Sequence, residues 1–176
     1  MIEGFFAANE ARLLRRYAKN ARGAIVEIGS YKGLTTSILA QGARESGQLV
    51  YAIDPHNAYD DPHPGGASFG PADNIEFLRN IAPFGDVVRV INLPAEQVVQ
   101  CWNWREKIDL LFIDGSHLFA DVMRDFYLWS VFVDGHILLH DTTTIADVRD
   151  FLQHIFNAGK WQLVERADST AVLKQC

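Results

Sequence analysis

Acidic and histidine side chains stand at or just after the ends of five successive apolar runs of this sequence. They are Glu27, Asp54, Glu96, Asp114 with His117, and His140 with Asp141. Carboxylates bind ammonium groups, hydroxyl groups and hard cations, and a neutral imidazole accepts a proton near neutral pH. If the apolar runs are parallel strands, these groups meet at one edge of a sheet, where α/β proteins bind ligands. A single acid of this kind is usually a surface loop residue, but the repeated pattern predicts a ligand site.

The first of these turns, EIGSYKG (27–33), differs from a dinucleotide-binding turn. Such a turn has the pattern GxGxxG, whose second glycine lets the backbone approach a pyrophosphate. Gly29 permits a tight turn here, but Tyr31 stands where the second glycine is needed. A nucleotide without phosphates, such as S-adenosylmethionine (SAM), therefore fits this turn better than a dinucleotide does.

Three polar residues around the turn match the parts of SAM. Glu27 offers a negative charge for the ammonium group of the amino-acid tail, through water or the backbone. Thr35 and the start of the following helix can hold the tail carboxylate, because free N–H groups at a helix N-terminus favour an anion. Asp54 is placed to accept hydrogen bonds from both ribose hydroxyls. Taken alone, Glu27 could also be a salt-bridged strand acid.

Strands alternate with helices along the chain. Apolar runs predict strands at 24–28, 49–53, 87–92, 108–113, 136–140, 161–166 and 170–174. Helical spacing predicts helices in 1–22 and at 34–46, 74–82, 95–102, 118–132 and 146–156, with Asp73 as the N-cap of the third. The polar segment 56–72, rich in glycine and proline, predicts a loop and a candidate lid.

This order predicts an α/β fold. Strands that are apolar throughout, with helices between them, are typical of a mainly parallel sheet covered on both faces. The last two strands have no helix between them, which favours an antiparallel hairpin at one edge. With 176 residues, no internal repeat and no linker, residues 1–176 form one domain.

Composition excludes several classes of protein. The net charge of -6 argues against a nucleic-acid partner, since phosphate contacts need a clustered basic face. The basic residues between Arg12 and Arg22 are most simply a solvated helix face, with a docking surface as the alternative. Two cysteines, Cys101 and Cys176, make no disulfide framework, and the first is expected to be buried. Without a membrane-length apolar run or a signal cleavage site, the sequence predicts a cytoplasmic protein.

Four motifs together resemble a known family. EIGSYKG, YAIDP (51–55), IDLLFIDGSH (108–117) and GHILLHD (135–141) are similar to motifs of the small class I SAM-dependent methyltransferases. More narrowly, they resemble the group of macrocin-type O-methyltransferases and cephalosporin-hydroxylase-like proteins, over about residues 20–142. The resemblance implies a Rossmann-like, doubly wound, seven-stranded and mainly parallel sheet with an antiparallel last strand. It also implies a methyltransferase.

The first turn also resembles that of catechol-type O-methyltransferases, and this likeness implies roles for individual residues. The implied cofactor-binding set is Glu27, Gly29, Ser30, Tyr31, Thr35, Asp54, Pro55, Ala95, Glu96 and Asp114. Within it, Asp54 would bind the ribose, and Ala95 with Glu96 would flank the adenine.

The resemblance further implies a divalent metal. Asp114 and Asp141 match its acidic ligands, but Thr142 replaces an expected Asn. Oxygen donors and water suit Mg²⁺, whereas adding His140 as a ligand shifts the preference toward Mn²⁺ or Zn²⁺. In the alternative interpretation, Asp141 caps a helix and His140 is a core histidine.

The implied reaction is O-methyl transfer by in-line displacement. A metal at Asp114 and Asp141 would lower the pKa of the acceptor hydroxyl, and His117 is the candidate general base. His117 could instead be a surface or helix-starting residue. The lid residues would be His56, Tyr59, His63 and Phe69.

The acceptor class stays open between sugar and phenolic or other natural-product hydroxyls. A non-catalytic SAM-binding module and a nicotinamide-dependent oxidoreductase are the rival functions. A hydroxylase is disfavoured because the sequence lacks an HxD…H iron triad. Trp102, Trp104 and Trp129 could support a homodimer, although aromatic residues at such spacing are more often core.

Overall fold

The computed structural model describes residues 2–56, 70–103 and 107–176. Its helices are α1 Ala8–Lys19, α2 Leu34–Ser46, α3 Pro71–Ile81, α4 Ala95–Val98, α5 Phe119–Ser130 and α6 Ala146–Asn157. Its strands are β1 Ala24–Ile28, β2 Val50–Ile53, β3 Val88–Ile91, β4 Ile108–Ile113, β5 Val133–Leu139, β6 Trp161–Ala167 and β7 Thr170–Gln175. Tyr59, His63, Phe69 and Trp104 lie outside the described residues.

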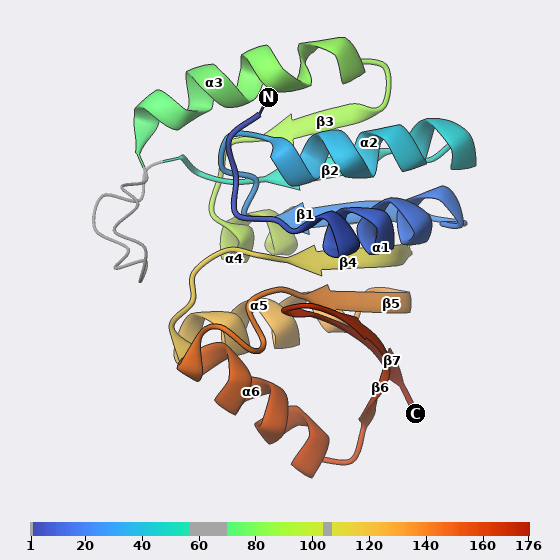
Figure 1. Ribbon diagram of the computed structural model, residues 1–176, viewed down its shortest axis with the longest axis vertical. Coiled ribbons are helices and arrows are strands. Elements are labelled where there is room, and N and C mark those ends of the chain that lie inside the picture. Colours follow the sequence, from blue (N-terminus) through green and yellow to red (C-terminus); the bar gives the residue numbers. More distant parts are fainter. Residues whose placement is uncertain (1, 57–69, 104–106) are drawn as a thin grey trace.

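The strands form one seven-stranded sheet in the order β3-β2-β1-β4-β5-β7-β6 (Figure 1). β1 to β5 run parallel, and β7 is antiparallel to both β5 and β6. The order reverses at β1, whose neighbours are β2 and β4, so the ends of β1 and β4 form the crevice in which such sheets bind ligands. The doubly wound α/β sheet and its closing hairpin confirm the predicted fold class.

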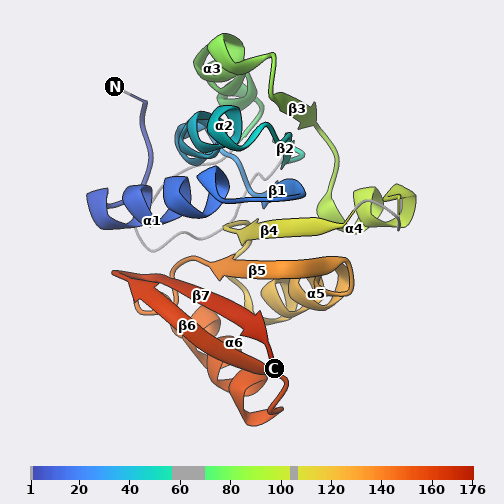
Figure 2. The same cartoon turned by 90° about the vertical axis from the view of Figure 1, so that its right-hand side faces the viewer.

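Helices cover both faces of the sheet (Figure 2). α1, α2 and α3 pack one face through a core that includes Leu14, Leu39 and Phe77. α4, α5 and α6 pack the other through a core that includes Phe126 and Phe151. Because both faces are buried, β1 and β4 are apolar along nearly their whole length, as the sequence pattern predicts.

The N-terminal helix α1 lies directly against α2. Gly42 of α2 allows this, since a Cβ there would come within 2.7 Å of Ala18 Cβ and of Arg15 O. The basic side chains of α1 point outward: Arg15 and Lys19 pair with Glu45 at 2.8 and 2.7 Å. This is the solvated helix face expected from the sequence.

Several local expectations were wrong. Asp73 lies in the first turn of α3, where its carboxylate accepts the Gly70 N–H at 2.8 Å, because the helix begins earlier, at Pro71. β5 begins at Val133, before the apolar run of the sequence, because Val133 pairs with Ile108 of β4. The register then shifts across Asp134 and Gly135 before regular pairing resumes at His136. Cys101 is exposed rather than buried.

Two tryptophans belong to the core. Trp129 is completely buried, and Trp102 packs edge-on against it with ring centroids 5.3 Å apart. These two side chains therefore stabilise the fold, and a homodimer stays a prediction. Within the described part of the chain, no helix has the length and apolar character that a membrane crossing requires.

Candidate functional site

Two adjoining cavities open at the carboxyl ends of the central strands. The larger, of about 340 Å³, is lined by residues after β1, β2, β3 and β4 and by part of α5. The smaller, of about 60 Å³, lies between the first turn and the N-terminal segment 3–6. Gly29, Tyr31, Asp114 and His117 line both cavities.

All the residues expected in the site, except Glu27, line one cavity or the other. Asp54, Pro55, Ala95 and Glu96 line the larger cavity. Ser30, Thr35, His140 and Asp141 line the smaller. The parallel strands bring them together, because each residue follows a strand that ends at the same edge of the sheet.

The first turn is shaped by Gly29 and Tyr31. Gly29 has φ +85°, and a Cβ there would lie 2.3 Å from the carbonyl oxygen of Asp114, so only glycine lets the ends of β1 and β4 meet. Tyr31 also has a positive φ, of 44°, which is uncommon for a residue with a side chain. Between them, the Ser30 hydroxyl is buried with no hydrogen-bond partner among the described residues.

Asp54 holds this turn in place. Its Oδ2 accepts the backbone N–H groups of Ser30 and Tyr31, each at 2.9 Å, and its Oδ1 accepts that of His56 at 2.8 Å. His56 is buried, with its Nε2 2.9 Å from the Tyr31 carbonyl oxygen. His56 therefore joins the turns after β1 and β2, instead of standing on a lid.

Glu27 lies beneath the first turn and lines neither cavity. It is completely buried, and Thr36 Oγ1 donates a hydrogen bond to its Oε2 at 2.5 Å. Burial raises the pKa of Glu27 to about 8, although hydrogen bonds from Thr35 and Thr36 oppose the shift. Its Oε1 has no hydrogen-bond partner in the described part of the chain. At neutral pH this carboxyl group is therefore mostly protonated.

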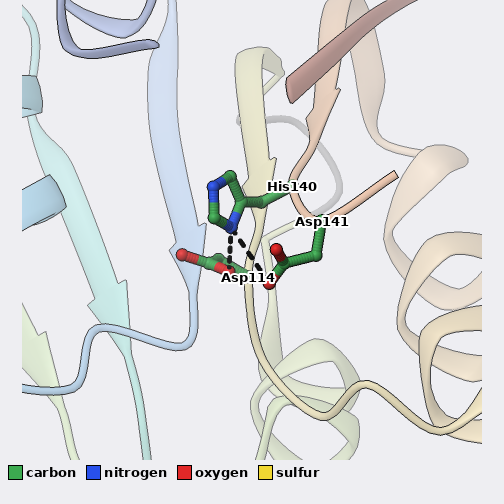
Figure 3. A group of neighbouring side chains, drawn as sticks. All are labelled: Asp114, His140 and Asp141. Carbon is green, nitrogen blue, oxygen red and sulfur yellow. Dashed lines mark hydrogen bonds and ion pairs between the residues drawn. The ribbon is translucent and has the colours of Figure 1, made fainter. Parts of the chain in front are cut away.

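Asp114, His140 and Asp141 form a compact cluster (Figure 3). His140 Nδ1 lies 2.9 Å from Asp114 Oδ1 and 3.3 Å from Asp141 Oδ2. Burial alone would lower the pKa of His140, but the charge and hydrogen bond of Asp114, with those of its other acidic neighbours, raise it to about 12. His140 is thus held as an imidazolium between two carboxylates.

Asp141 also contacts His117. The distance from His117 Nε2 to Asp141 Oδ2 is 3.1 Å. Although burial alone would raise the pKa of Asp141, hydrogen bonds from His117 and His140 hold it well below its usual value. An ionised Asp141 therefore orients the imidazole of His117, which lies at the junction of the two cavities.

Sequence reasoning missed Glu10, whose carboxylate lies on the far side of His140. Its Oε1 is 3.4 Å from His140 Nε2 and accepts hydrogen bonds from the Ser169 N–H, the Ser169 hydroxyl and the Thr170 hydroxyl at 3.0, 2.7 and 2.9 Å. Burial opposes ionisation, but these bonds and those from His140 and Ala7 lower the pKa of Glu10 to about 2. A signal was present, because Glu10 shares the helical face of Leu13 and Leu14, which is buried.

The cluster meets the requirements of a divalent ion only in part. One donor atom each from Asp114, His140 and Asp141 lies within 4.8 Å of the others. Both ring nitrogens of His140 face carboxylates, however, which favours a proton on each, whereas a metal ligand needs a free lone pair. Thr142 is turned away, since its hydroxyl donates to the Ser169 carbonyl at 2.6 Å. As arranged, these residues fit an imidazolium rather than a divalent ion.

The larger cavity does fit a nucleoside. Its volume lies in the range of small-molecule sites, and its wall combines apolar surface with a few polar groups. The carboxylate of Asp54 lies in this wall, where it accepts hydrogen bonds from the backbone N–H groups of Ser30 and Tyr31 at the first turn. α5 adds Arg124 and Asp125 to this wall, neither of which was expected from the sequence.

Comparisons with known proteins agree with this geometry. A family profile described as a methyltransferase domain matches residues 26–142. The chain is similar in structure to the O-methyltransferase NovP, with 14% identity and a TM-score of 0.72, over 95% of this chain and 79% of that one. An O-methyltransferase from Bacillus cereus in complex with SAH has 20% identity and a TM-score of 0.69, over 97% and 83% of the two chains.

SAH-bound PaMTH1, a methyltransferase from Podospora anserina, has 15% identity and a TM-score of 0.71, over 98% of this chain and 80% of that one. At such low identities these three likenesses establish a shared fold. The family profile covers more than half of the chain, across β1 to β5 and every turn that lines the cavities. The chain therefore belongs to the methyltransferase-domain family.

Proposed function

We propose that this protein transfers the methyl group of SAM to a hydroxyl of a small molecule, of the sugar or phenolic natural-product type. The observation that carries the proposal is the position of His117, which lines both cavities and lies 3.1 Å from Asp141. A base that lines both the nucleoside-sized cavity and the adjoining cavity at the first turn lies where a methyl donor held across the two can meet an acceptor hydroxyl. The SAH in two of the similar structures supports SAM as the donor.

In this proposal the larger cavity holds the cofactor. Asp54 binds the ribose hydroxyls while its other lone pairs keep the first turn in place. Ala95 and Glu96 flank the adenine, and Pro55 closes the same wall. The amino-acid tail extends past Gly29 toward Ser30, Tyr31 and Thr35 in the smaller cavity. Bound SAM supplies a methyl group on a positively charged sulfur, which is already a good leaving group.

The chain's own contribution is alignment and proton removal. We assign the removal of the acceptor hydroxyl's proton to the imidazole of His117, whose Nε2 lies 3.1 Å from Asp141 Oδ2. Asp114 lines both cavities, so we assign it contacts with cofactor and acceptor alike. Holding acceptor oxygen, methyl and sulfur in line converts an encounter of two molecules into an oriented reaction.

Participation of Mg²⁺ or Mn²⁺ stays a prediction of the sequence. The measurement is methyl transfer before and after treatment with EDTA, followed by addition of each ion. Full turnover in EDTA would remove the metal from the mechanism and leave the assignment of SAM untouched. Loss of turnover that Mg²⁺ or Mn²⁺ restores would mean that His140 gives up a proton to make room for the ion.

The experiment that tests the proposed function is calorimetric titration with SAM and SAH, followed by transfer of isotope-labelled methyl to a panel of sugars and phenols. Asp54→Ala should abolish binding of both ligands, because the ribose contact and the anchor of the first turn disappear together. Unchanged affinity in this variant would refute the cofactor assignment. Tight binding of SAM without transfer to any acceptor would favour the non-catalytic binding module.

A further inference from the structure

Asp125, on α5, has a buried carboxyl group that the mechanism above does not use. It is only 4% exposed, yet it lines the larger cavity with Ala95, Glu96 and Gly115. Its Oδ1 has no hydrogen-bond partner among the described residues, and its ion pair with Arg124 Nε is long, at 3.6 Å. A buried polar atom without a partner destabilises the folded protein, so native proteins rarely keep one without a purpose.

A purely structural role for Asp125 is already filled by its neighbour. Asp121, one turn earlier on α5, accepts hydrogen bonds from the Ser116 hydroxyl at 2.7 Å and from Arg124 Nη1 at 2.8 Å. Asp121 therefore both holds the turn after β4 and neutralises Arg124. Asp125 makes no such short hydrogen bond and keeps only its longer ion pair with Arg124. Its other oxygen, Oδ2, lies only 3.8 Å from where a Cβ on Gly115 would stand, at the cavity wall.

The surroundings of Asp125 leave it able to accept or to share a proton. Burial raises its pKa to about 6, Arg124 opposes the shift, and Glu96 adds to it. Such a carboxyl group suits a neutral partner that offers an N–H donor.

We propose that the carboxyl group of Asp125 accepts a hydrogen bond from the exocyclic amino group of the cofactor's adenine, and so selects adenine over other purines. The inference rests on the proposed function, which places the ribose at Asp54 and the base between Ala95 and Glu96. The 6-amino group is the donor by which adenine differs from unsubstituted purine. A site built around such a donor discriminates strongly against a ligand that lacks it, because the buried acceptor is then left unpaired.

The test compares the affinities of SAH and of its 6-deamino analogue, in which purine replaces adenine, by calorimetry. The unaltered protein should bind SAH about 10- to 100-fold more tightly than the analogue, the range expected for a hydrogen bond to a charged group. In Asp125→Ala this ratio should fall to near one. Asp125→Asn, whose amide oxygen can still accept, should keep a preference for SAH, and the matched control Asp121→Asn should keep the full ratio.

The outcomes separate the two proposals. Binding of SAH with the same ratio in Asp125→Ala as in the unaltered protein would overturn the role of Asp125 alone. Binding of neither ligand by the unaltered protein would overturn both this role and the proposed function. If the alanine variant does not fold, SAH labelled with nitrogen-15 at the amino group gives a second readout. Its bound NMR signal should differ from that of free SAH and move in Asp125→Asn, and an unshifted signal would overturn the assignment.

Discussion

Glu27 and Asp141 are carboxyl groups with pKa values that are displaced in opposite directions. Burial dominates at Glu27 and raises its pKa to about 8, although its two partners, the hydroxyls of Thr35 and Thr36, oppose the shift. Asp141 faces two histidines, so it stays ionised even though it is partly buried. Pairs of titratable groups whose environments separate their pKa values often divide the roles in an active site. Here Glu27 has a structural role, and Asp141 orients the candidate base.

Glu27→Gln should change how the stability of the folded protein depends on pH. Because the folded-state pKa of about 8 exceeds the ordinary value of 4.5, the unfolded chain ionises first, and the native state loses stability as pH rises from 4.5 toward 8. The loss should approach about 1 kcal/mol per pH unit in this window. Urea denaturation of both proteins across the window measures it. Glu27→Gln should remove this part of the slope, and parallel curves would show that Glu27 is ionised in the folded protein.

His117→Ala should slow the reaction. Loss of a general base typically lowers the rate of the catalysed step by about 10²- to 10⁴-fold. We expect such a fall in kcat, with the calorimetric affinity for SAH nearly unchanged. The exposed His154, replaced by Ala, is the control and should leave kcat as it is. Equal kcat values in the His117 and His154 variants would remove His117 from the reaction.

At the scale of elements, α1 and the β6–β7 turn act together on the end of β5. Glu10 of α1 accepts three hydrogen bonds from Ser169 and Thr170 and contacts His140 just beyond β5. Segments from the two ends of the chain are thereby fastened to the edge of the sheet where the site lies. The N-terminal helix is thus part of the support of the Asp114 cluster.

Glu10→Gln tests this support. The substitution keeps the shape of the side chain but removes the charge that faces His140, and breaking a buried pair in this way costs about 3–5 kcal/mol. Urea denaturation should show a loss of stability of this order. Glu45→Gln is the control, because Glu45 pairs with Arg15 and Lys19 at the surface. The urea midpoint of this variant should equal that of the unaltered protein. Equal midpoints for the two variants would mean that Glu10 is dispensable.

For the whole molecule, the fold places every proposed ligand contact at one edge of a single sheet. Ligand binding and global unfolding are therefore coupled, since a ligand that contacts the turns after β1 to β4 cannot bind the unfolded chain. The protein has a net charge of -6. The basic face of α1 forms ion pairs with Glu45 and Glu165.

This coupling predicts the thermal stability of the complex. SAH at a hundred times its dissociation constant should stabilise the protein by about 2.7 kcal/mol. For a domain of this size that corresponds to a rise in Tm of about 5–10 °C. Differential scanning fluorimetry measures the shift, with NADH as the comparison ligand. A rise with NADH and none with SAH would favour the nicotinamide-dependent oxidoreductase.

Much of the fold was predictable from the sequence, because strands buried on both faces must be apolar throughout. The expected strands 24–28 and 108–113 match β1 and β4 at both ends. The doubly wound order follows from alternation with helices, and it already implied that the turns after the strands would meet. β5 was misplaced at its start because Asp134 and Gly135 are polar or small, and only the pairing of Val133 with Ile108 of β4 extends the strand back beyond them.

The sequence by itself determined which residue types stand at the edge of the sheet, since strand ends and the polar residues after them are local features. Only the tertiary structure decided how those groups are paired. His140 became an imidazolium because Asp114 and Asp141 face one of its ring nitrogens, while Glu10, 130 positions away in the chain, approaches the other. Asp125 kept an unpartnered oxygen because Asp121 took the bonds of Ser116 and Arg124. Charge states and free acceptors depend on distances between segments remote in sequence, which no local pattern contains.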